Sequence, residues 1–236
     1  PHSHPQMVNV YHNLLTRILE IINAFSQEDE KRACELFEIL EELIEYAVAV
    51  VVPHVRLIVD MCLRIGGDSS MPTTVQIKAI SVVGWLIRSK GKVIQKNKLV
   101  EPIINVLIQL MAQQPDDDVN EEYFLGDPDQ FTSITLATQT LDLIALHIPS
   151  EKVVPYLLTR VEPAIQGNDI YAQKAAYLSL AVLAEGCSER IRHKYLEPFL
   201  KCVCNAIHNP NAVVRNAAFF ALGQFAEHLQ VGWFLV

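Results

Sequence analysis

Apolar residues recur every three or four positions along much of the chain, and alternation of apolar and polar residues is nowhere sustained. A spacing of three and four places side chains on one face of an α-helix. The low content of Gly and Pro, 9 and 12 of 236 residues, argues against an all-β protein, because such folds need a turn about every ten residues. The pattern therefore predicts an all-α fold. Its clearest stripe contains Ala33, Leu36, Phe37, Leu40, Leu43, Ile44 and Ala47.

The chain also repeats itself. Residues 169–185 align with residues 211–227 at a shift of 42, sharing an Ala-Ala-aromatic step and a final Ala-Glu, and weaker copies occupy 75–86 and 136–144. An apolar segment with a Pro near its start, where a helix tolerates Pro, precedes each copy. These prolines are Pro53, Pro102, Pro155 and Pro198. Helix pairs of this length stack into an α-α superhelix, a solenoid in which each pair buries its face against its neighbours. About five antiparallel pairs are predicted, at 8–46, 50–89, 93–147, 151–186 and 189–229.

The last pair resembles a HEAT repeat. Its run Asn209-Pro210-Asn211-Ala212-Val213-Val214-Arg215-Asn216-Ala217-Ala218, followed by Ala221-Leu222-Gly223, is similar to the HEAT pattern Asp-Pro-x-x-x-Val-Arg-x-x-Ala with Leu-Gly. The sequence has Asn209 where the pattern has Asp. A ladder between repeats that pairs this position with Arg215 is therefore expected to lose its charge.

Three segments point to one family among HEAT-repeat proteins. They are residues 29–35, 146–152 and 214–225. They are similar to the karyopherin-β family of nuclear import receptors, over about residues 28–230 and about a fifth of such a receptor. The resemblance implies a protein that is not an enzyme, needs no cofactor, and shuttles between cytoplasm and nucleus as a monomer. It would carry basic cargo, such as core histones or ribosomal proteins, past nucleoporins and release it on binding Ran-GTP. Residues 231–236 do not continue the pattern, and we expect the sequence to be a piece of a longer protein.

Charge and cysteine content limit the other possibilities. The net charge of −8 disfavours a direct nucleic-acid binder, which needs Lys and Arg to neutralise phosphates, and favours a basic protein partner. Five Cys spread singly through apolar stretches form no disulfide framework and fit a reducing compartment. The longest uninterrupted apolar run, Ala47–Val52, is too short to cross a bilayer, so no membrane role is expected.

The third predicted pair contains an acidic insertion. From its Pro to the aligned Ala takes 35 residues, against 20 or 21 in the last two pairs. The extra residues lie in 115–130, which contain no Lys or Arg. Two interpretations stay open, a solvated insertion and a contact for a basic surface. The family resemblance implies a contact with Ran or cargo. The acidic residues are Asp116, Asp117, Asp118, Glu121, Glu122, Asp127 and Asp129.

A second candidate site lies on two predicted second helices, which line the concave face in HEAT solenoids. Glu35, Glu38, Glu42 and Glu45 follow the spacing i, i+3, i+7 and i+10 opposite the apolar stripe. They form either an ordinary solvated face or a surface for basic cargo. Trp85 lies in a similar series with Lys78, Ser81 and Arg88, and is either packed in the core or exposed to stack on a cargo cation.

No motif points to catalysis or to a bound metal. Cys202-x-Cys204 with His208 is the nearest approach, but two residues apart on a helix point about 200° from each other and cannot share an ion. We therefore predict a protein that binds other proteins reversibly. The alternative is a HEAT scaffold that assembles an enzyme complex, such as a phosphatase; an enzyme in its own right is a third and weaker alternative.

Overall fold

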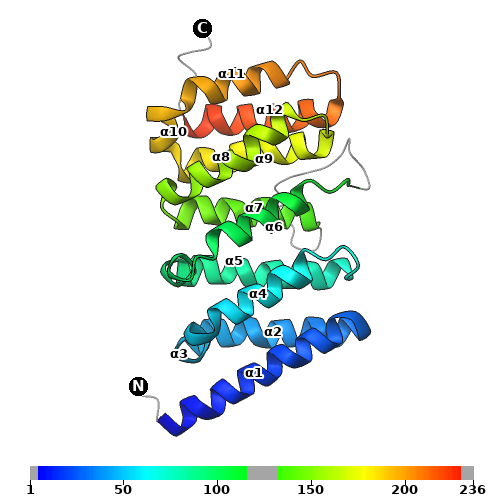
Figure 1. Ribbon diagram of the computed structural model, residues 1–236, viewed down its shortest axis with the longest axis vertical. Coiled ribbons are helices and arrows are strands. Elements are labelled where there is room, and N and C mark those ends of the chain that lie inside the picture. Colours follow the sequence, from blue (N-terminus) through cyan, green and yellow to red (C-terminus); the bar gives the residue numbers. More distant parts are fainter. Residues whose placement is uncertain (1–4, 116–131, 230–236) are drawn as a thin grey trace. The chain divides into compact units, whose positions relative to one another are not determined.

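The computed structural model describes residues 5–115 and 132–229, and nearly all of these lie in helices joined by short turns (Figure 1). No described residue lies in a strand, so the all-α prediction is confirmed. The chain divides into two compact units, residues 1–103 and 104–236. The predicted boundaries of the repeats, the acidic insertion and the 231–236 tail stay predictions, and the tail lies outside the described residues.

The first unit is built from two helix pairs. The long helix α1 packs on α2, α4 packs on α5, and the second helices α2 and α5 lie against each other in one layer (Figure 1). The short α3 and η1 connect the pairs. The helix α6 begins in this unit and continues into the next. The bounds are α1 Pro5–Glu28, α2 Glu30–Tyr46, α3 Val48–Val51, η1 Val52–His54, α4 Val55–Gly66, α5 Thr73–Lys96 and α6 Val100–Met111.

Local sequence accounts for α2, the helix that carries the four glutamates Glu35, Glu38, Glu42 and Glu45. Its N-cap Asp29 accepts a hydrogen bond from the Arg32 N–H at 3.1 Å, which satisfies a donor left free at a helix start. Phe37, Leu40 and Ile44 are buried at the predicted spacing, with at most 1% of each side chain exposed. The apolar stripe therefore faces the core, and the opposite face is left to the glutamates.

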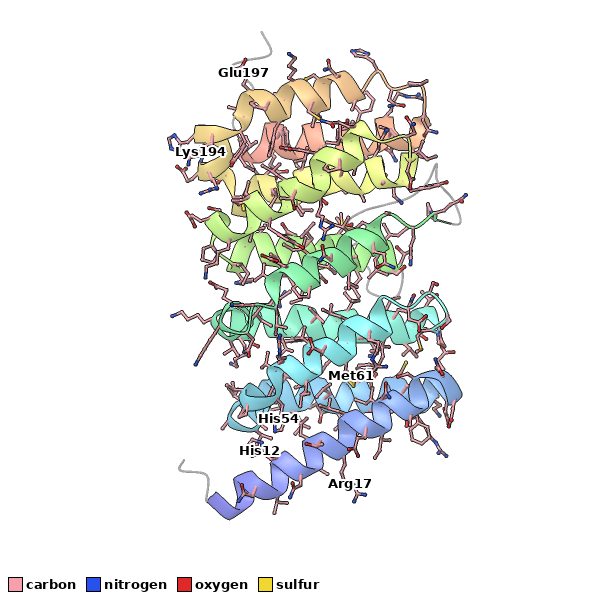
Figure 2. All side chains as sticks on the ribbon, in the orientation of Figure 1. His12, Arg17, His54, Met61, Lys194 and Glu197 are labelled. Carbon is pink, nitrogen blue, oxygen red and sulfur yellow. The ribbon has the colours of Figure 1, made fainter. Side chains whose placement is uncertain are left out.

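A pair of histidines joins the first helix to the connection before α4. Figure 2 shows His12 of α1 beside His54 of η1, with His12 Nδ1 2.6 Å from His54 Nε2. Burial, followed by the charge of His12, lowers the pKa of His54. Since a hydrogen bond between two imidazoles needs one ring nitrogen without a proton, the contact requires one of the two rings to be neutral.

The second unit is centred on α9. This helix packs against α7, α8 and α12, and α11 packs on α12, so the second helices α7, α9 and α12 again form one layer (Figure 1). Because neighbours surround α9, every residue from Lys174 to Ala184 is buried and the helix has no broad polar face. The bounds are α7 Ser133–His147, α8 Ser150–Gln166, α9 Ile170–Gly186, α10 Ser188–Lys194, α11 Leu196–Ala206 and α12 Ala212–His228.

The prolines fit the predicted helix starts with one exception. Pro53 is the second residue of η1, and Pro102 and Pro198 are third residues of α6 and α11. Pro155 lies inside α8, which begins at Ser150, so the expectation of a first-turn Pro was wrong here. No single helix of the described chain is long and apolar enough to span a membrane; only the pair Glu30–Tyr46 and Val48–Gly66, bent by 107°, passes that test together.

Candidate functional site

The acidic face of α2 is open to solvent. Glu35, Glu38, Glu42 and Glu45 are all exposed, and they lie opposite the buried Phe37. Three-and-four spacing on a helix brings neighbouring side chains close, so like charges here repel by roughly 0.2–0.5 kcal/mol per pair. The structure therefore keeps four carboxylates on one surface although their mutual repulsion costs stability.

A lysine from the neighbouring helix reaches this face. Lys78 Nζ of α5 lies 2.8 Å from Glu38 Oε1 and forms an ion pair across the two second helices. Burial disfavours the Lys78 ammonium, but the hydrogen bond and charge of Glu38 outweigh it and raise the Lys78 pKa. Burial also raises the pKa of Glu41, which the nearby Lys78 partly offsets. The acidic face is therefore partly neutralised at its centre.

The C-terminal end of the face is not neutralised by an ion pair. Within the described part of the chain, Glu42 and Glu45 form no ion pair. At the other end, the exposed Glu35 lies 3.9 Å from Lys31. A pair at that distance between exposed groups contributes little. The charge of Glu42 and Glu45 is thus available to a partner. We call Glu35, Glu38, Glu42 and Glu45 the acidic face from here on.

Trp85 is exposed rather than packed in the core. Its side chain is 41% exposed, and the Arg88 guanidinium carbon lies 5.8 Å from the centre of its ring. Contacts of Thr74 with Glu30 and of Lys78 with Glu38 run in the same order along the two helices, so α2 and α5 are parallel. The two contacts join residues 44 and 40 positions apart, which puts Trp85 alongside residues 41–45 of α2. A cation approaching the ring would compete with Arg88.

The acidic residues of the insertion, Asp116, Asp117, Asp118, Glu121, Glu122, Asp127 and Asp129, lie outside the described residues. The chain on either side is described. Gln113 follows α6, and Ser133 opens α7; the Ser133 hydroxyl donates to Gln113 Oε1 at 3.1 Å. The two ends of the intervening stretch therefore lie close together.

One titratable group was missed by the sequence analysis. Asp142 of α7 lies near Glu185 of α9 and His228 of α12 in the layer of second helices. Burial, followed by the charge of Glu185, raises the pKa of Asp142 to about 6, and His228 opposes the shift. No short-range motif could have revealed this group, because its neighbours lie 43 and 86 positions away in the sequence.

The expected ladder residue Arg215 is satisfied inside its own turn. Its Nη1 donates to the carbonyls of Asn209 and Pro210, each at 2.8 Å. The Asn209 side chain accepts from the Asn211 N–H at 2.9 Å, which helps shape the turn before α12. The Asn in place of the Asp of the HEAT pattern thus serves the turn, and Arg215 binds main-chain oxygens.

The cysteines are arranged as isolated thiols. Burial raises the pKa of Cys202, whose Sγ lies 3.9 Å from the Tyr177 hydroxyl. Among residues 5–115 and 132–229, no group of three or more His, Cys, Asp or Glu side chains is placed to hold a metal ion.

Comparison with known proteins relates the chain to importins. No family model matches it. It is 34% identical to mouse Importin-4 over 238 residues, covering 96% of this chain and 22% of that protein. Human Importin-4 is 33% identical, with 98% and 22% covered. The probable importin subunit beta-4 of Schizosaccharomyces pombe is 22% identical over 224 residues, with 94% and 20% covered. The chain thus spans about a fifth of the length of these relatives.

Solved structures share the fold. The crystal structure of Kap121p gives a TM-score of 0.80 at 19% identity and covers 96% of this chain and 23% of Kap121p. Kap121p bound to RanGTP gives 0.78 at 20% identity, and Kap121p bound to Nup53p gives 0.79 at 20% identity. Each of these two covers 92% of this chain and 22% of Kap121p. The likeness confirms the predicted α-solenoid.

Proposed function

The chain belongs to the karyopherin-β family, and we propose that it is one segment of a nuclear import receptor that binds basic protein cargo through its second helices. The observation that carries the proposal is the exposed acidic face of α2. In this reading core histones or ribosomal proteins are the cargo, the receptor acts as a monomer, and it moves between cytoplasm and nucleus. It neither catalyses a reaction nor binds nucleic acid directly.

Electrostatics supports the choice of a basic partner. Lys or Arg side chains that approach the acidic face attract its carboxylates and also reduce the repulsion between them. Both effects favour association with a basic partner. Trp85, alongside residues 41–45 of α2, adds an aromatic surface on which a Lys or Arg stem can stack. Lys78 beside Glu38 limits the attraction at the centre of the face. Binding is therefore proposed to concentrate around Glu42, Glu45 and Trp85.

Release and passage through the pore are proposed from the relatives. Kap121p has been solved bound to RanGTP and to Nup53p, and we extend Ran-GTP and nucleoporins to the receptor that contains this segment. The acidic insertion is proposed as a contact for Ran or cargo. Its residues Asp116, Asp117, Asp118, Glu121, Glu122, Asp127 and Asp129 give it the charge that a basic surface needs.

Charge reversal tests the acidic face. We expect Glu42→Lys with Glu45→Lys to weaken binding of a lysine-rich histone-tail peptide about tenfold at 50 mM NaCl, measured by fluorescence anisotropy. The loss should fade at 0.5 M NaCl, because the Debye length falls to a few ångströms. A matched double variant, Glu20→Lys with Glu28→Lys, makes the same change in net charge on exposed positions of α1. Equal weakening by both variants, or by neither, contradicts a site on α2.

A further inference from the structure

One basic side chain in the described part of the chain is fully buried. Lys174 of α9 has no exposed surface, whereas the other buried polar side chains among the described residues are Ser, Thr and Gln. Removing an ammonium from water costs several kcal/mol unless polar groups of the protein replace the water. A lysine at this place therefore needs specific polar partners, and these partners identify the segment of the chain that Lys174 binds.

Lys174 binds the chain that leaves α6. Its Nζ donates to the Gln113 carbonyl at 2.9 Å and lies 5.5 Å from the centre of the Tyr171 ring. Gln113 stands two residues beyond Met111, the last residue of α6. Carbonyls at a helix C-terminus lack intrahelical partners and carry partial negative charge, so a cation is favourable there. The fourth helix pair thus reaches across to the end of the first helix of the third pair.

Gln113 is also bound through its side chain. Its Oε1 accepts from Ser133 Oγ at 3.1 Å, and Ser133 is the first residue of α7. The preceding Thr132 caps α7 by accepting from the Thr135 N–H at 3.0 Å. Gln113 is therefore bound by α9 through its main-chain carbonyl and by α7 through its side-chain amide oxygen.

We propose that Lys174, Gln113 and Ser133 form a clasp that fixes both ends of the stretch 114–132 to α9, with Lys174 as its positioning residue. Holding Gln113 and Ser133 together fixes the separation of the two points at which the intervening stretch leaves α6 and enters α7. The inference rests on the proposed function, because the acidic residues proposed to meet Ran or cargo belong to this stretch.

Hydrogen exchange of the full chain tests the clasp directly. Lys174→Met keeps the length of the apolar stem and removes the donor. We expect at least tenfold faster exchange at the amides of Ala112, Gln113 and Leu136, which close the two helix ends. Val182→Ala, a truncation in the buried part of the same helix, is the matched control for lost core stability. If Val182→Ala lowers the melting temperature by the same amount and speeds exchange at these amides equally, the clasp is contradicted.

A milder variant keeps the test valid if Lys174→Met does not fold. Ser133→Ala removes the hydroxyl that binds Gln113 and leaves the buried ammonium in place. We expect faster exchange of the Gln113 amide, across the clasp, with no change in α12. If only amides of α7 respond, Ser133 acts as a local helix-start residue and the clasp is contradicted.

Binding separates the clasp from the proposed function. With a decalysine peptide as the probe at 50 mM NaCl, we expect Lys174→Met to bind several-fold more weakly than Val182→Ala. Loosened exchange with unchanged decalysine affinity supports the clasp and contradicts a binding role for the insertion. Unchanged exchange contradicts the clasp whatever the affinity.

Discussion

Gly186 at the end of α9 lies so close to Ala145 of α7 that a Cβ on the glycine would be 2.3 Å from the Ala145 carbonyl carbon and oxygen. Main-chain atoms cannot move aside as a flexible side chain does. The third and fourth helix pairs therefore meet through a backbone contact that only glycine permits, and the spacing of α7 and α9 is set at this point.

Gly186→Ala should lower the free energy of unfolding by about 1–3 kcal/mol, because the added methyl must push the two helices apart. Gly223→Ala is the matched control: it is also helical, and a Cβ there meets nothing within 4 Å. It should raise stability by up to about 1 kcal/mol through helix propensity. Urea denaturation measures both, and equal effects of the two substitutions would refute the close contact.

Asp142→Asn should stabilise the protein at neutral pH. A carboxyl whose folded pKa is raised from 3.8 to about 6 contributes stability that is complete below pH 3.8 and is lost as the pH rises through 6. The Asn variant should therefore gain on the order of 1 kcal/mol at pH 7.5, since partial solvent screening reduces the full effect. The gain should vanish below about pH 4. Thermal unfolding across this range checks it, and a gain independent of pH would rule out the titration.

The histidine pair should give the opposite pH dependence. The pKa of His54 is lowered from 6.5 in the folded protein, so the unfolded chain binds the proton more readily. The contribution of His54 is present above pH 6.5 and is lost as the pH falls toward its folded pKa. His54→Gln should be destabilised relative to the parent at pH 7.5, and this difference should shrink by pH 5. A constant difference over that range would contradict the assignment.

Lys78→Gln should strengthen binding of the histone-tail peptide. The substitution removes the cation that lies 2.8 Å from Glu38, so the acidic face attracts a basic partner more strongly. The expected gain is about two- to fivefold at 50 mM NaCl, the size of one partly exposed ion pair. Lys92→Gln, at an exposed position of the same helix, is the charge-matched control. Weaker binding by Lys78→Gln would place the cargo surface elsewhere.

The sequence predicted those features that depend on one helix. The three-and-four spacing of Phe37, Leu40 and Ile44 correctly assigned the buried and exposed faces of α2, because this helix has a core on one side only. In α9, packing on several sides buries residues all around the helix, and the periodicity that would mark an exposed face is absent.

Features that depend on contacts between two helices could not be predicted from the sequence. The ion pair of Lys78 with Glu38 depends on the register of α5 against α2, and the bond from Lys174 to Gln113 joins residues 61 positions apart. The choice between a packed and an exposed Trp85 also needed the neighbouring helix. Pro155 was expected in a first turn, but α8 begins at Ser150, five residues earlier, so the proline lies inside the helix.

The turn before α12 has a mechanical consequence. Arg215 binds the carbonyls of Asn209 and Pro210, so these two bonds stay within its own helix pair. Bending between α9 and α12 must instead be resisted by their close packing, in which Ala217, Ala218 and Ala221 are fully buried. Contacts of this kind act only at short range. This joint should therefore lose less of its resistance to bending as ionic strength rises than a joint held by an ion pair between exposed side chains.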